Sequence, residues 1–110
     1  MEIKTEDYTI QTSGGSKSVI EGIMRLTSPA AYEKDFEHIQ QGIQNSPQYT
    51  VDISKVNFMN SSGITALSRL VLLARNTNKA LTLVIDEGIP WQKKTIGSLK
   101  KLYEKLEIQG

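Results

Sequence analysis

Residues 51–67 decide the fold of this chain, and they read VDISKVNFMNSSGITAL. The stretch opens in a short run of residues that favour strands, which predicts a central strand over residues 49–53. The polar residues 54–57 are expected to end that strand. Beyond a polar turn at residues 60–63, apolar residues recur at helical spacing, at Ile64, Leu67, Leu70, Val71 and Ala74. The stretch therefore predicts a strand that leads through a turn into a helix.

Similar patterns on both sides extend this prediction to the whole chain. The turn-forming residues around Gly14 and Gly15 predict a hairpin, and Gly22 marks a bulge or a close backbone contact in its second arm. The expected strands cover residues 8–11, 18–26, 49–53 and 80–85, with an edge strand over 107–109. The expected helices run from a cap hydroxyl within residues 27–29 to about residue 45, from Ile64 to about residue 76, and from Pro90 onward to include Leu106. We therefore predict one α/β domain over residues 1–110, in which an antiparallel hairpin precedes parallel strand–helix–strand units.

The composition narrows the classes of function. The chain has 110 residues and a net charge of +1, which gives no long-range attraction to nucleic acid or to anionic lipid. It has no cysteine and one histidine, His38, so neither a metal cluster nor a catalytic triad is predicted. The polar start and the lack of a long apolar run predict a cytoplasmic protein without membrane insertion. We therefore expect a binding protein that is not an enzyme and has no cofactor.

Lysines gather in the last third of the sequence. Five of them are expected to face outward from the helix that starts at Pro90, whereas Trp91 is expected to pack into the core; they are Lys93, Lys94, Lys100, Lys101 and Lys105. An ordinary solvated helix face explains this pattern, and so does a surface that orients a partner.

The central stretch resembles the core of STAS domains. In that family an apolar strand with an acid and a short polar turn precede an aromatic or aliphatic residue, any residue, Asp, Ser, Ser or Thr, Gly and an aliphatic residue that enters a helix. Phe58, Asn60, Ser61, Ser62 and Gly63 follow this pattern here. The resemblance implies a small domain with helices mainly on one face of its sheet. It also implies a protein that binds a switch-kinase anti-sigma factor and releases it when a hydroxyl at this turn is phosphorylated.

The resemblance places the phosphoacceptor at Ser61, with Ser62 and Thr65 as secondary candidates. It also implies a partner-binding face around this turn, made of Asn60, Ser61, Ser62, Gly63 and Arg69, with the Gly14–Gly15 hairpin turn nearby. A helix begins at the carboxyl end of its preceding parallel strand, so this turn is expected at the rim where partners bind. A simpler explanation for these hydroxyls is that Ser61 or Ser62 caps the helix.

One residue departs from the family pattern, because Asn60 stands where the family has an aspartate. Asparagine keeps the hydrogen-bonding capacity of that position but removes its negative charge. Two hypotheses therefore remain open. In the first, the chain is an anti-sigma factor antagonist switched by phosphorylation. In the second, it is a non-phosphorylated scaffold or a subunit of a larger signalling or transport assembly.

Overall fold

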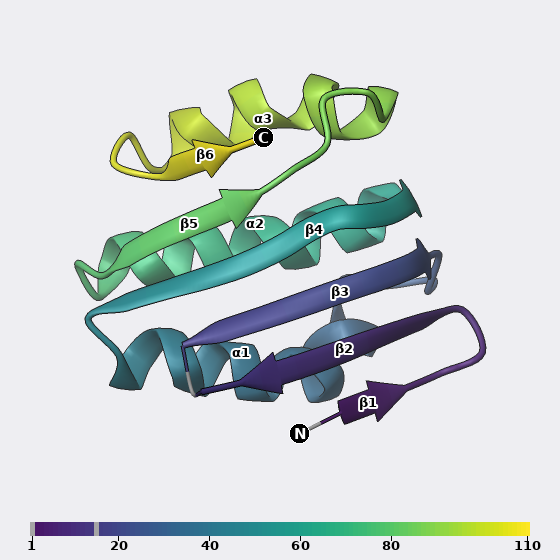
Figure 1. Ribbon diagram of the computed structural model, residues 1–110, viewed down its shortest axis with the longest axis horizontal. Helices are drawn as coiled ribbons and strands as arrows, with labels where there is room; N and C mark the ends of the chain where they lie inside the picture. Colours follow the sequence, from purple (N-terminus) through teal and green to yellow (C-terminus); the bar gives the residue numbers. More distant parts are fainter. Residues whose placement is uncertain (1, 15) are drawn as a thin grey trace.

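The computed structural model describes residues 2–14 and 16–110, and within them six strands form one sheet in the order of the chain (Figure 1). The strands are β1 (Glu2–Lys4), β2 (Tyr8–Ser13), β3 (Lys17–Met24), β4 (Gln48–Met59), β5 (Ala80–Val84) and β6 (Glu107–Gln109). The pairs β1–β2 and β2–β3 are antiparallel, and the pairs from β3 to β6 are parallel. The predicted α/β class with a mixed sheet is confirmed.

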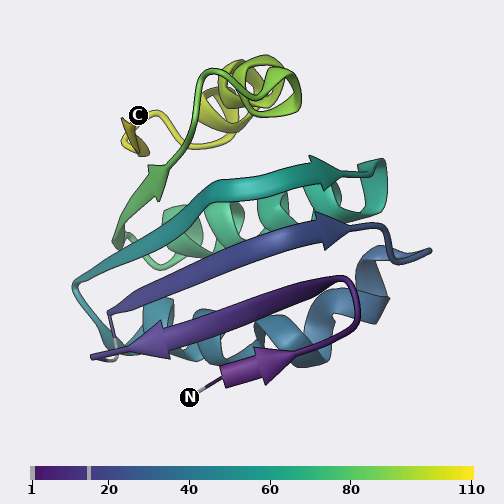
Figure 2. The ribbon, with the colours of Figure 1, turned by 45° about the vertical axis from the view of Figure 1, so that its right-hand side comes forward.

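Three α-helices connect the parallel strands: α1 (Glu33–Asn45), α2 (Ser61–Asn76) and α3 (Pro90–Leu102). Right-handed crossovers that all step in one direction across a sheet place their helices on the same face. Both views show α1 and α2 behind the sheet (Figures 1 and 2), and α3 packs beside α2 at the β5–β6 end. No helix in the described ranges is long and apolar enough to cross a membrane. No helix among the described residues covers the opposite face of the sheet, which is the open face.

The hydrophobic core lies between the sheet and the helices. Side chains less than 2% exposed come from both layers, and they include Ile10, Ile20, Phe36, Ile39, Ile43, Val51, Leu67, Leu70 and Leu83. Polar groups within this layer are paired, because the Tyr8 hydroxyl donates to Asp35 and the hydroxyls of Ser18 and Tyr49 lie 2.5 Å apart. Burial and the Asp35 carboxylate raise the pKa of Tyr8. The core therefore consists of the apolar residues whose spacing predicted the strands and helices, together with a few hydrogen-bonded hydroxyls.

Strand β4 is longer than the sequence predicts, and the expected end of the strand near Ile53 is wrong. It continues to Met59 because β3 keeps pairing with it after β5 has left at Asp52. The pairing with β3 shifts register twice, so β4 contains extra residues that bulge out of the ladder. In the first bulge the Asp52 carboxylate accepts hydrogen bonds from the Ser54 amide (2.9 Å) and hydroxyl (2.6 Å). The polar residues 54–57 therefore belong to the strand.

Other boundaries differ at the two ends of the chain. Strand β1 was not predicted, because its three residues carry no clear alternation. Helix α3 ends at Leu102, so the buried Tyr103 and Leu106 lie beyond it and Lys105 is not on the helix. The edge strand over residues 107–109 is confirmed, and the Ser28 hydroxyl caps a short 3-10 turn, Pro29–Tyr32, that leads into α1.

The expected closeness of the hairpin turn to the start of α2 is wrong. Lys17, just after the turn, pairs with Thr50 near the amino end of β4, whereas α2 starts after Met59 at the carboxyl end. The two regions therefore lie at opposite ends of the sheet, as Figure 1 shows. Gly15 itself lies outside the described residues.

Candidate functional site

The starts of α2 and α3 lie at the same rim of the sheet, on the right in Figure 1. Each helix follows the carboxyl end of a parallel strand, which is where α/β sheets place their binding sites. The start of α3 is tied to β4, because the side-chain NH₂ of Gln92 donates to the carbonyls of Ile53 (2.8 Å) and Val56 (3.0 Å). The Trp91 indole N–H also donates to Val56 (2.9 Å). This rim is the candidate functional site.

Asn60 joins three segments at this rim. Its side-chain oxygen accepts from the Gly63 amide (2.9 Å) and thereby caps α2. Its side-chain NH₂ donates to the Leu26 carbonyl (2.9 Å), just after β3. Its backbone amide donates to the Met24 carbonyl (2.9 Å). An asparagine satisfies both side-chain partners, whereas an ionised aspartate has no donor for Leu26.

The cap assigned to Asn60 removes the simpler explanation for Ser61 and Ser62, so the hypothesis that one of them caps α2 is wrong. Ser61 is the first residue of α2 and is exposed, whereas Ser62 is half-buried. Thr65 is exposed one turn further along, and Arg69, also exposed, lies two turns along. The Ser61 hydroxyl thus stands at the helix start without a capping role.

Arg69 forms an ion pair with Glu33 of α1, with 3.7 Å between the charged atoms. Both side chains are more than half exposed, so this pair contributes little to stability. Ser61, Thr65 and Arg69 recur every fourth residue, and they therefore lie along one line of α2. The structure brings these three predicted residues onto one exposed surface.

Gly63 is buried where α2 meets β4. A Cβ atom at this position would lie 2.6 Å from the Met59 Cγ atom, whereas a Cβ atom at Gly97 of α3 would meet nothing within 4 Å. We expect Gly63→Ala to lower the free energy of unfolding by about 1–2 kcal/mol, because overpacking exceeds the gain in helix propensity. Gly97→Ala should raise it by about 0.5–1 kcal/mol. Urea denaturation of both variants checks the sign, and equal effects would contradict the close contact at Gly63.

Two exposed apolar side chains next to this turn were missed by the sequence analysis as functional candidates. Ile23 (40% exposed) and Phe58 (50% exposed) are register partners across β3 and β4. Their neighbours Met24 and Met59 are buried against the helices, so Ile23 and Phe58 point to the open face of the sheet. Phe58 precedes Ser61 by three residues, so their Cα atoms lie within about 11 Å. An exposed apolar pair therefore lies at the end of β3 and β4, just before the turn that carries Ser61.

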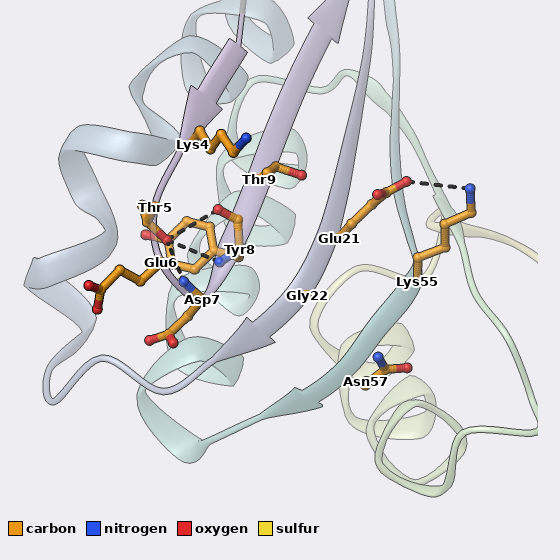
Figure 3. Close-up of a pocket in the computed structure, with 10 residues that line it drawn as sticks. All are labelled: Lys4, Thr5, Glu6, Asp7, Tyr8, Thr9, Glu21, Gly22, Lys55 and Asn57. Carbon is orange, nitrogen blue, oxygen red and sulfur yellow. Dashed lines mark hydrogen bonds and ion pairs between the residues drawn. The ribbon is translucent and has the colours of Figure 1, made fainter.

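A polar groove of about 430 Å³ lies on the open face, close to the turn between β1 and β2 (Figure 3). Ten residues line it: Lys4, Thr5, Glu6, Asp7, Tyr8, Thr9, Glu21, Gly22, Lys55 and Asn57. Two of its acids are paired, Glu21 with Lys55 (3.4 Å) and Asp7 with Arg25 (3.1 Å). The groove includes none of the sequence-predicted site residues, and the charges of Asp7, Glu21 and Lys55 in it are paired.

The remaining polar candidates do not converge on the rim turn. His38 is exposed on α1. The Asp86 carboxylate accepts from the Gly88 amide (2.8 Å), which gives that acid a local turn-forming role like that of Asp52. Within residues 2–14 and 16–110, no group of three or more His, Cys, Asp or Glu side chains is placed to hold a metal ion.

Comparison with known proteins leaves the family open. No protein-family model matches this chain, and a search of curated proteins finds no match. The resemblance to STAS domains therefore rests on the residues of the central stretch.

Proposed function

We propose that this chain is a STAS-like switch protein, which binds a kinase-type anti-sigma factor or a similar regulator and is controlled by phosphorylation at Ser61. The observation that carries this proposal is the exposed Ser61 hydroxyl at the start of α2, where Asn60 supplies the cap. A side chain that is exposed at a binding rim and has no structural duty is accessible to a kinase. Such a phosphoacceptor needs no general base beside it, because the kinase supplies the chemistry.

We expect a phosphate on Ser61 to weaken the binding of the partner without unfolding the domain. A phosphoserine adds about −1.5 to −2 charges at neutral pH. At a helix N-terminus a negative charge stabilises the helix by about 0.3–1 kcal/mol, so the domain should stay folded. The exposed pair of Ile23 and Phe58 gives the partner an apolar contact within reach of Ser61. A charged, hydrated group at the edge of such a contact opposes its burial.

The test compares Ser61→Asp with Ser61→Ala in the chain's own cells. We expect Ser61→Asp to recover at least about tenfold less of the co-purified regulator than Ser61→Ala, which should retain it under all conditions. Quantitative mass spectrometry of the purified complexes and phosphosite mapping of the wild-type chain give both readouts.

Ser13→Asp is the matched control, because Ser13 is exposed at the opposite end of the sheet. It should recover the regulator as the wild type does. Equal recovery with Ser61→Asp and Ser61→Ala, together with an unmodified Ser61, would reject the switch.

A second candidate function, a constitutive scaffold or assembly subunit, has one observation in its favour. The Asn60 side-chain amide is hydrogen-bonded to both Gly63 and Leu26. The residue before Ser61 therefore stabilises the fold, and it lacks the negative charge that the STAS pattern has at this position. Under this hypothesis the partner stays bound whether or not ATP is added to the purified complex. Release on addition of ATP would argue for the switch.

A further inference from the structure

The outward side of α3 forms a basic stripe that the proposed switch does not use. Pro90, Lys94, Gly97 and Lys101 are spaced by four, three and four residues, so they lie along one line of the helix, and all four are exposed. Lys93 is exposed beside this line. The opposite side of α3 buries Gln92, Thr95 and Leu99. The stripe spans eleven residues of rise, or about 16 Å.

Within the part of the chain that the structure describes, no acidic side chain forms a salt bridge with the lysines of this stripe. Helix α3 contains no acid. The three salt bridges found among the described residues join Arg25 to Asp7, Lys55 to Glu21 and Arg69 to Glu33. Lys100 differs from its neighbours, because its amino group donates to the carbonyls of Glu104 (2.9 Å) and Leu106 (2.6 Å) beyond the helix end. Lys93, Lys94 and Lys101 form none of these salt bridges, although Lys101 lines a hollow together with the exposed Glu104.

Gly97 sits in the middle of this surface without a packing reason. A glycine inside a helix lowers the stability of that helix. The glycine of α1 is explained by a close neighbour, because a Cβ atom at Gly42 would lie 2.2 Å from the Tyr49 ring. At Gly97 a Cβ would meet nothing within 4 Å. The chain itself does not require a glycine at this point, but the close approach of another backbone would.

A hollow adjoins the stripe at the start of α3. It measures about 550 Å³ and is lined by Pro90, Trp91, Lys93 and Lys94. The Trp91 indole is held by its hydrogen bond to Val56 and remains half-exposed, so its prediction as a core residue is correct only in part. An anchored aromatic ring in a hollow that two lysines also line suits a ligand that combines an apolar side chain with acidic groups.

We propose that the exposed side of α3 is a docking surface for an acidic amphipathic helix of a partner protein. An apolar side chain of that helix occupies the hollow over Pro90 and Trp91, and acidic side chains pair with Lys93, Lys94 and Lys101. Its backbone crosses α3 at Gly97, where the absent Cβ permits close packing. Charge complementarity orients the helix and favours its encounter with α3.

A helix fits these features better than a lipid surface or a nucleic acid does. Neither lipid headgroups nor phosphodiesters need the flat surface at Gly97. The net charge of +1 for the whole chain gives little general attraction to either polyanion. The stripe also lacks a row of large apolar side chains that would insert into a bilayer.

The test uses the full chain and a synthetic helical peptide whose one face carries leucine and glutamate side chains. Trp91 is the only tryptophan, so its fluorescence reports on the hollow, and calorimetry gives the affinity. We expect saturable binding that shifts the Trp91 emission. The double variant Lys94→Glu/Lys101→Glu should bind about tenfold more weakly or worse, because like charges then face each other across the contact. Gly97→Leu should weaken binding similarly while keeping a good helix former in place.

The controls distinguish binding at the exposed side of α3 from an effect of the net charge of the chain. Lys17→Glu/Lys34→Glu makes the same change in net charge at exposed positions on β3 and α1, and it should bind as the wild type does. The same peptide with glutamine in place of glutamate should bind at least about tenfold more weakly. The proposal is overturned by the absence of saturable binding, by equal binding of the glutamine peptide, or by tighter binding of phosphatidylglycerol vesicles or duplex DNA. None of these outcomes depends on Ser61.

Discussion

Gly22→Ala is expected to lower the free energy of unfolding by about 3–5 kcal/mol, because two separate costs add. Gly22 has a φ of +119°, a backbone conformation that residues with a side chain rarely adopt. A Cβ atom there would also lie 2.3 Å from the Asp7 carbonyl oxygen and 2.8 Å from the Tyr8 Cα atom. Both obstacles are backbone atoms, so no rotamer change relieves the overlap. A loss of this size is a large share of the stability of a small domain.

The effect of Gly22→Ala is measured by urea denaturation, with Gly14→Ala as the matched control. Gly14 also has a positive φ, +64°, but a Cβ atom there would meet nothing within 4 Å. Gly14→Ala should therefore cost only the conformational part, about 1–2 kcal/mol. Equal losses in the two variants would show that the close approach of β3 to the Asp7–Tyr8 backbone is wrong. That approach matters for function, because the next residue, Ile23, is presented on the open face.

Asn60→Ala is expected to lower the free energy of unfolding by about 2–3 kcal/mol, through the loss of the α2 cap and of the donor to Leu26. Asn60→Asp separates these contributions, because a carboxylate keeps the cap but has no hydrogen for the Leu26 carbonyl. We expect a loss of about 1–2 kcal/mol for Asn60→Asp at neutral pH. Thermal or urea unfolding of both variants gives the comparison.

An Asn60→Asp variant as stable as the wild type would contradict the structural role of the amide donor. The same variant bears on the proposed switch, since it restores the acid of the STAS pattern beside Ser61. If Ser61 becomes phosphorylated only in Asn60→Asp, the scaffold hypothesis is favoured for the natural chain. If Ser61 is phosphorylated in both, the neutral residue is compatible with the switch.

Much of the fold follows from local patterns in the sequence. The helical spacing after Ile64, the apolar run over residues 80–85 and the cap predicted within residues 27–29 each correspond to an element of the structure. Periodicity and capping depend on residues within one or two turns of each other, which a sequence displays directly. The short edge strand β1 escaped prediction because three residues that depend on β2 for pairing carry too little pattern.

Two features of the candidate site, the exposure of Phe58 and the cap of α2, do not follow from local patterns. Alternation from the buried Val56 would place Phe58 in the core as well, yet a register shift between β3 and β4 turns Phe58 outward and Met59 inward. Likewise, the sequence marks residues 60–63 as a turn but does not reveal which residue caps the helix. Asn60 takes that role while it holds the Leu26 carbonyl, 34 residues earlier in the chain.

The sequence by itself determined the α/β class, the order of the main elements and the position of the Ser61 turn before α2. Local propensities and spacings are sufficient for these features. Only the tertiary structure decided that Ile23 and Phe58 are exposed together, that Ser61 is free of the capping role, and that Gly97 leaves the basic side of α3 flat. The first depends on how β3 and β4 pair, and the choice of Asn60 as the cap is accompanied by its hydrogen bond to Leu26, 34 residues earlier. The third depends on which side of α3 the rest of the fold covers. Such contacts between distant segments leave no local signal in the sequence.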